Sequence, residues 1–112
     1  MKTIKTVLTT LEDLQLEDIV VYDMRERSPF FDYCVLSTAK NTRQLNAALT
    51  HLKNNLQAAK HPLPMVEGAG SEAWVLMDAK EVIVNIFTRE ERAYYNLEKM
   101  WMDIPVLDTE SW

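Results

Sequence analysis

The residues that could do chemistry in this sequence are two histidines, one cysteine and scattered aspartates. His51 and His61 have no cysteine or acidic ligand pattern beside them, which favours surface or helix-end histidines over a metal site. Cys34 stands in an apolar run without the neighbours of a catalytic thiol, so we expect a small buried side chain. No Ser-His-Asp or Cys-His arrangement is recognisable. The sequence therefore predicts no catalytic residue, no metal and no cofactor.

A segment with both glycines of the chain, Gly68-Ala69-Gly70-Ser71, could instead bind phosphate. It lacks the lysine and the spacing of a phosphate-binding loop, and the residues after it are typical of a strand rather than a helix. It also resembles the Gly-Ser element of nucleotidyltransferases, which need two alternating carboxylates on one strand to hold divalent metal ions. The strand that follows offers only Asp78. The catalytic pair is therefore missing.

The stretch from residue 71 to residue 87 predicts two strands joined by a turn at 78–81. Residues 82–87 are apolar on both alternating faces except for Asn85, which is typical of a strand inside a sheet. In the first strand, Trp74, Leu76 and Asp78 share one face, because side chains alternate along a strand. Two large apolar residues beside a carboxylate suit a contact surface better than a core. We expect the working surface here.

Aromatic residues of the last third of the chain are candidates for the same surface or for the core. Tryptophan and tyrosine are frequent in interfaces because they bury a large area and keep a polar group. We expect Tyr94 and Trp101 to pack in the core.

Periodicity predicts the elements that position these residues. Apolar residues at helical spacing predict helices at 3–16 and 41–60, the second capped by Asn41 with Gln44 three residues on. β-Branched and aromatic runs predict strands at 19–24, 33–38 and 65–67, besides the hairpin. Thr88, with Glu91 at the capping-box position, predicts a last helix from 89 toward 101. The result is a single α/β domain over 1–112, with a mixed sheet of about five strands flanked by helices and a loose tail at 104–112.

Charge and composition restrict the partners. Seventeen acidic and twelve basic residues give a formal net charge of −5 without a cluster of Lys and Arg, which disfavours direct DNA binding. An acidic protein is better matched to a basic protein. No apolar run approaches the length that a membrane helix needs, and a single cysteine suits a reducing compartment, so we expect a cytoplasmic protein with no membrane contact.

Six segments in order, covering about residues 4–103, resemble the ribosomal silencing factor family, also called RsfS or Iojap-like. The matching segments are 17–23, 32–37 with 41–44, 66–68, 74–78, 82–87, and 92–98 with Trp101. The resemblance implies a nucleotidyltransferase-like α/β fold without the catalytic carboxylates. It also implies a non-enzymatic translation repressor that binds the large ribosomal subunit on its fourteenth protein. Bound there, such a protein sterically blocks joining with the small subunit, and off the ribosome it is a homodimer.

On this resemblance, Trp74 and Leu76 supply apolar anchoring and Asp78 pairs with a basic group of the ribosomal protein. Tyr95 and Arg92 are expected to extend this contact. The chain departs from the family in having Asn85 where a histidine is usual, and Ala79-Lys80 where the turn often has glycine. We therefore expect a turn longer than a two-residue type I′ turn. One alternative is a divergent nucleotidyltransferase or nucleotide-binding protein that uses Gly70, Ser71 and Asp78. Another is a dimeric adaptor whose Trp74 face only self-associates.

Overall fold

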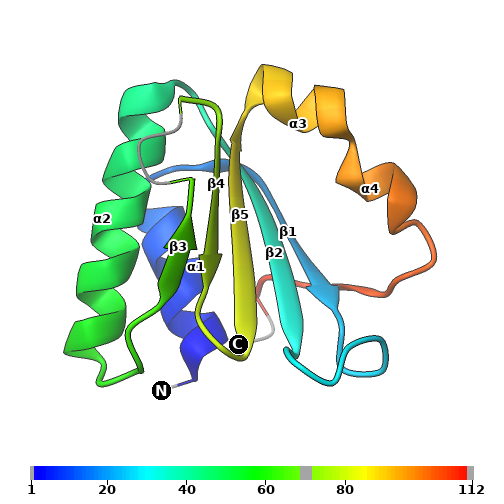
Figure 1. Ribbon diagram of the computed structural model, residues 1–112, viewed down its shortest axis with the longest axis horizontal. Coiled ribbons are helices and arrows are strands. Elements are labelled where there is room, and N and C mark those ends of the chain that lie inside the picture. The colour runs from blue at the N-terminus through cyan, green and yellow to red at the C-terminus, as the bar shows by residue number, and fades with distance from the viewer. Residues whose placement is uncertain (1, 69–71, 111–112) are drawn as a thin grey trace.

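The structure is a computed structural model that describes residues 2–68 and 72–110 (Figure 1). Its elements in chain order are α1 Thr3–Asp13, β1 Glu17–Asp23, β2 Tyr33–Ala39, α2 Thr42–Ala58, β3 Met65–Glu67, β4 Trp74–Asp78, β5 Val82–Thr88, α3 Arg89–Tyr95, α4 Leu97–Met100 and β6 Val106–Leu107. Within these residues no helix is both long and apolar enough to cross a membrane.

The sheet has the strand order β3-β4-β5-β2-β1-β6. Only the β2–β5 pair is parallel, and the other four pairs are antiparallel. β5 lies between β4 and β2, and its side chains are buried on both faces along most of its length, as its nearly continuous apolar run predicts. The mixed α/β fold is therefore confirmed, with one strand more than the five expected.

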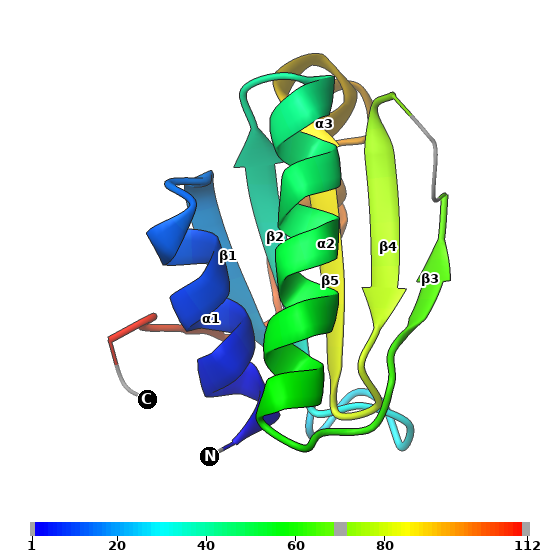
Figure 2. The same ribbon diagram turned by 90° about the vertical axis from the view of Figure 1, so that its left-hand side faces the viewer.

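Two helices cover one face of the sheet. Figure 2 shows α1 and α2 side by side across it, and their apolar stripes meet the strands in the main core. That core includes Leu11, Leu52, Val35 and Val84, each of them fully buried. Such an arrangement follows from the helical spacing of the apolar residues, because each helix can bury only one stripe.

The cap of α2 is as predicted. Asn41 accepts a hydrogen bond on its side chain from the Gln44 N–H, at 2.8 Å. The reciprocal bond of the box is displaced by one residue, because the Gln44 side-chain oxygen accepts from the Lys40 N–H at 2.6 Å instead. α1 is shorter than expected and ends at Asp13, since Gln15 takes a positive φ of 60°.

The other face of the sheet is covered only in part. In Figure 1, α3 and α4 stand on the side of the sheet away from α2. They pack over β5, β2 and β1, where Phe87, Leu36 and Tyr22 form a second, smaller core with Ile104. β3 and β4 have no helix over this face. We call this uncovered part the open face; its residues are Met65, Glu67, Trp74, Leu76, Asp78 and Ile83, which share one side of the sheet by cross-strand register.

The prediction of a continuous last helix was wrong. Thr88 stands at the helix start but makes no side-chain capping hydrogen bond, so the capping box with Glu91 is not formed. Asn96 adopts the left-handed conformation, with φ 47° and ψ 54°, and this ends α3 before α4 begins. Asparagine accepts that conformation at lower cost than most residues. The break turns α4 back over the sheet.

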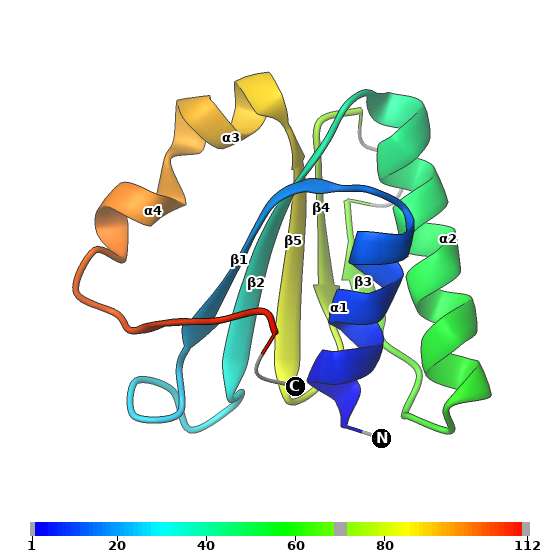
Figure 3. The same ribbon diagram turned by 180° about the vertical axis from the view of Figure 1, so that it is seen from behind.

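The chain end was also predicted incorrectly, because residues 104–107 are not loose. Val106–Leu107 pairs with β1 as a short antiparallel strand, and the Asp23 N–H donates to the Pro105 carbonyl at 2.9 Å. Ile104 is buried in the second core. Figure 3 shows this segment running from α4 back to the edge of β1.

Candidate functional site

An apolar groove lies where the open face meets α4. It has a volume of about 310 Å³, and its lining is Met24, Phe31, Cys34, Trp74, Leu76, Ile83, Asn85, Leu97 and Trp101. Trp74, Leu76 and Ile83 come from the strands, while Leu97 and Trp101 come from α4 and the residue that follows it. A groove of this size and chemistry can receive one or two apolar side chains from another molecule.

Trp74 is held in a defined orientation at one end of the groove. Its ring stacks on Phe87 with centroids 5.0 Å apart and meets the ring of Tyr95 at 4.8 Å. The indole N–H of Trp74 donates to the side-chain oxygen of Asn85 at 3.0 Å. An aromatic side chain fixed in this way loses little further freedom when a partner binds, which favours tight association.

Beneath the groove, Asn85 links Trp74 to Cys34. Asn85 is 3% exposed, and its amide nitrogen lies 3.5 Å from the Cys34 sulfur. Burial raises the pKa of the Cys34 thiol to about 12, although the hydrogen bond from Asn85 acts in the opposite direction. The thiol is therefore neutral at physiological pH, and a neutral thiol is a poor nucleophile. The prediction of a buried Cys34 is confirmed.

The apolar surface continues from the groove toward the edge of the sheet. A second hollow of about 190 Å³ is lined by Glu67, Gly68, Trp74 and Leu76. Met65, which is 74% exposed, lies on the same side in register with Asp78. The open face thus presents apolar side chains flanked by carboxylates to a partner.

Asp78 has a role inside the hairpin as well as a place on the open face. One of its carboxylate oxygens accepts from the Lys80 N–H at 2.9 Å. The prediction of a turn longer than two residues was wrong: Ala79 donates its N–H to the Val82 carbonyl, so only Lys80 and Glu81 lie between the paired residues. The turn is also not of type I′, because Lys80 takes a φ of 68° but Glu81 does not take a positive φ. A substitution at Asp78 would therefore affect both the turn and any contact.

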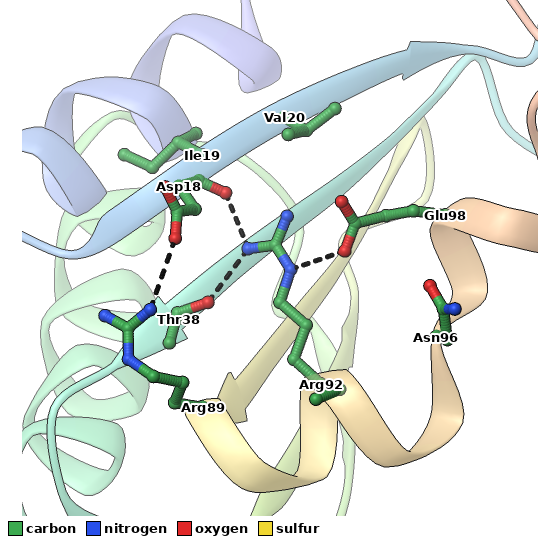
Figure 4. A pocket seen from close by; sticks show the side chains of 9 residues that line it. Asp18, Ile19, Val20, Thr38, Arg89, Arg92, Asn96 and Glu98 are labelled. Carbon is green, nitrogen blue, oxygen red and sulfur yellow. Dashed lines mark hydrogen bonds and ion pairs between the residues drawn. The ribbon is translucent and has the colours of Figure 1, made fainter.

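Arg92 lies apart from the groove, whereas Tyr95 contacts Trp74 beside it. Its side chain is nine-tenths buried, and its guanidinium donates to the Asp18 carbonyl at 2.6 Å, the Thr38 hydroxyl at 2.9 Å and the Glu98 carboxylate at 2.8 Å (Figure 4). These bonds join α3 to β1, β2 and α4. The structure therefore brings Trp74, Leu76 and Tyr95 together, places Asp78 at the far end of the same strand, and assigns Arg92 to an internal network.

Several residues of the groove could not be recognised from local pattern. Met24, Phe31, Ile83 and Leu97 come from four separate segments, and only Ile83 shared the apolar alternation that identified the hairpin. Trp101 packs against the second core and meets Tyr22 edge-on at 5.2 Å, as predicted for a core residue. The same prediction was wrong for Tyr94, which is 79% exposed.

The two histidines lie apart from one another in the described part of the chain. His51 is exposed on α2, and His61 makes long hydrogen bonds to the hydroxyls of Thr3 and Thr6. Among residues 2–68 and 72–110 no three His, Cys, Asp or Glu side chains are grouped to hold a metal. Gly70 and Ser71 lie outside the described residues.

Comparison with known proteins identifies relatives along the whole sequence. A family model described as "Ribosomal silencing factor during starvation" matches residues 1–112. A Bacillus subtilis protein named ribosomal silencing factor RsfS is 32% identical over 107 residues, covering 96% of this chain and 91% of that protein. A Mus musculus protein named mitochondrial assembly of ribosomal large subunit protein 1 is 26% identical over 101 residues, covering 88% of this chain and 44% of that protein. A crystal structure of a Chromobacterium violaceum protein matches with a TM-score of 0.84 at 29% identity, over 90% of this chain and 87% of that one.

Proposed function

Because this chain belongs to the ribosomal silencing factor family, we propose that it represses translation by binding the large ribosomal subunit and blocking its joining with the small subunit. The name of the mouse relative, which refers to assembly of the large subunit, supports the choice of subunit. We propose a binding role rather than an enzymatic one. The single observation that carries the proposal is the apolar groove on the open face, with Trp74 held rigidly at its end.

The open face has the composition of a contact with a basic protein. Trp74 and Leu76 are half-buried and can lose their remaining solvent contact to a partner. Glu67 and Asp78 place carboxylates beside them, and the chain as a whole carries a formal net charge of −5. Opposite charge accelerates encounter and aligns the two surfaces, while the apolar centre supplies most of the affinity.

The finer assignments extend this proposal. In it, the partner is the fourteenth protein of the large subunit, Tyr95 contributes to the rim beside Trp74, and the protein acts in the cytoplasm. Off the ribosome, a second copy of the chain covers the same apolar surface as a homodimer, because a patch of this kind is seldom left in water. Dimer formation and ribosome binding are then mutually exclusive.

Co-sedimentation with purified large subunits, small subunits and joined ribosomes tests the proposal, at two salt concentrations. We expect retention on free large subunits only, weakened by added salt. Trp74→Ala should reduce the affinity by about 30-fold, corresponding to about 2 kcal/mol for a central aromatic residue. Tyr94→Ala is the matched control, since Tyr94 is an exposed aromatic residue outside the groove lining.

A joining assay separates simple binding from silencing. Large subunits incubated with the protein should form fewer joined ribosomes when small subunits are added, and Trp74→Ala should restore joining. Retention on small subunits alone, or equal retention of wild type and Trp74→Ala, would overturn the proposal.

A further inference from the structure

A second cavity lies on the other side of α3 and α4 from the groove. Its volume is about 500 Å³, within the range of small-molecule sites, and its lining is Asp18, Ile19, Val20, Thr38, Arg89, Arg92, Ala93, Asn96 and Glu98 (Figure 4). Neither Trp74 nor Leu76 contributes to it. The cavity is therefore separate from the surface proposed to bind the ribosome.

The topology of the sheet places this cavity where α/β proteins bind ligands. β2 and β5 are parallel neighbours, and Ala39 pairs with Thr88 at their carboxyl ends. From there the chain turns into α2 on one face and into α3 on the other (Figure 1). A crevice opens outside the carboxyl ends of parallel strands where successive connections leave on opposite faces. Thr38 and Arg89, on either side of those strand ends, both line the cavity.

One nitrogen of the Arg92 guanidinium makes no hydrogen bond to the described residues. Two of its nitrogens bond to Asp18, Thr38 and Glu98, and across residues 2–68 and 72–110 no acceptor is bonded to the third, Nη2. In Figure 4 this nitrogen points toward the side of Ile19 and Val20. The side chain is nine-tenths buried and lines the cavity, so this nitrogen is available to a hydrogen-bond acceptor that enters there.

The second carboxylate oxygen of Glu98 lies beside Arg92 Nη2 as a hydrogen-bond acceptor (Figure 4). Glu98 bonds Arg92 through one carboxylate oxygen, and in Figure 4 the other oxygen is directed to the same side as Nη2. The charged residues of the lining, Asp18, Arg89, Arg92 and Glu98, are two acids and two bases. A ligand with no net charge is therefore favoured over a polyanion such as a nucleotide, which would be repelled by Asp18 and Glu98.

From this pairing we propose that the cavity binds a free α-amino acid. An α-amino acid carries a carboxylate and an ammonium group on one carbon, and so can accept from Arg92 Nη2 while donating to Glu98. Both contacts are charge-assisted and form inside a partly buried site. Val20, which is half-buried and packs against the second core, gives the side chain of the amino acid an apolar contact. The proposal concerns the isolated protein and does not depend on ribosome binding.

Two-dimensional ¹H–¹⁵N NMR spectra of the ¹⁵N-labelled, 112-residue protein test the proposal by titration with a panel of L-amino acids that have apolar, polar and charged side chains. We expect saturable shifts at the amides of Ile19, Val20 and Asn96 with at least one of them. N-acetyl-L-leucine lacks the ammonium group and L-leucinamide lacks the carboxylate, so both should bind at least about tenfold more weakly than L-leucine.

Glu98→Gln is the decisive variant. The amide oxygen can still accept from Arg92, so the network is kept, but the acceptor for the ammonium group is replaced by a donor. Amino-acid binding should fall at least about tenfold, whereas Glu90→Gln, the same change at an exposed residue of α3 outside the cavity, should have no effect. The proposal is overturned if no amino acid gives saturable shifts, if N-acetyl-L-leucine binds as well as L-leucine, or if Glu98→Gln binds unchanged. Inorganic phosphate or adenosine monophosphate binding in place of amino acids would also overturn it.

Discussion

Removal of the Arg92 guanidinium should destabilise the whole domain, because the side chain joins α3 to β1, β2 and α4. Arg92→Met keeps the length and the apolar stem of the side chain but deletes all three hydrogen bonds. They run to the Asp18 carbonyl, the Thr38 hydroxyl and the Glu98 carboxylate, at 2.6, 2.9 and 2.8 Å. The substitution therefore tests whether this residue is structural or a contact with the partner.

The expected magnitude follows from the burial of each partner. Breaking a buried ion pair costs about 3–5 kcal/mol when the remaining charge stays out of water. Glu98 is 42% exposed and can rehydrate, which reduces that cost. Thr38 is 1% exposed and would lose the charged donor to its hydroxyl, at about 1–3 kcal/mol. Since these contributions are not additive, we expect a loss of about 3 kcal/mol in the free energy of unfolding.

Urea denaturation followed by circular dichroism measures this loss. Arg89→Met is the control, because Arg89 is an exposed arginine one turn earlier whose ion pairs with Glu17 and Asp18 are on the surface. It should cost at most about 1 kcal/mol. The reasoning is refuted if Arg92→Met unfolds within about 1 kcal/mol of wild type. Weaker large-subunit binding by a variant of undiminished stability would instead make Arg92 a contact residue.

Three further predictions concern the hairpin and the strands beside it. Asn85→Leu removes the acceptor of the Trp74 indole N–H, and should weaken large-subunit binding by about five- to tenfold in the co-sedimentation assay. Asn85→His keeps an acceptor, so its affinity should stay within about twofold of wild type. Lys80→Gly should raise the free energy of unfolding by about 0.5–1 kcal/mol in urea, because Lys80 holds a φ of 68° that glycine adopts without a steric cost; a loss of stability would contradict this. Burial raises the pKa of Cys34 from 9.0 to about 12, so the thiol loses its proton at a lower pH in the unfolded chain than in the folded protein. The contribution of Cys34 to the free energy of unfolding should therefore be constant below pH 9 and decline as the pH rises toward 12. Cys34→Ala should remove the part of this decline that comes from the thiol. If the free energy of unfolding of this variant changes with pH as in wild type, the raised pKa of Cys34 is contradicted.

Much of the fold was predictable because it depends on local pattern. The helix α2 shows a regular apolar stripe and a polar cap at Asn41, and both signals act within a few residues of the chain. β5 was recognised as an inner strand because a strand that is buried on both faces needs a nearly continuous run of apolar residues, which its own sequence has. The alternation in β4 likewise separated the face of Trp74 and Leu76 from the face that joins the main core.

The errors arose where distant residues decide the structure. The pattern after Thr88 is typical of one helix, and nothing local shows that Asn96 adopts a left-handed conformation that turns α4 over the sheet. The strand β6 has only two residues, and it is ordered by pairing with β1 rather than by its own composition. Arg92 stands among glutamates and looks like a surface residue, yet its partners are 74 and 54 positions away. The groove is likewise assembled from separate segments.

Site-specific crosslinking on the large subunit tests the central claim most directly. Met65 is exposed on the open face next to the groove, and Thr50 is exposed on α2, on the opposite side of the sheet. A photoreactive benzoylphenylalanine in place of Met65 should crosslink to a protein of the purified large subunit, and the same residue in place of Thr50 should not. Crosslinking from position 50 with none from position 65 would contradict the assignment of the open face as the ribosome-binding surface.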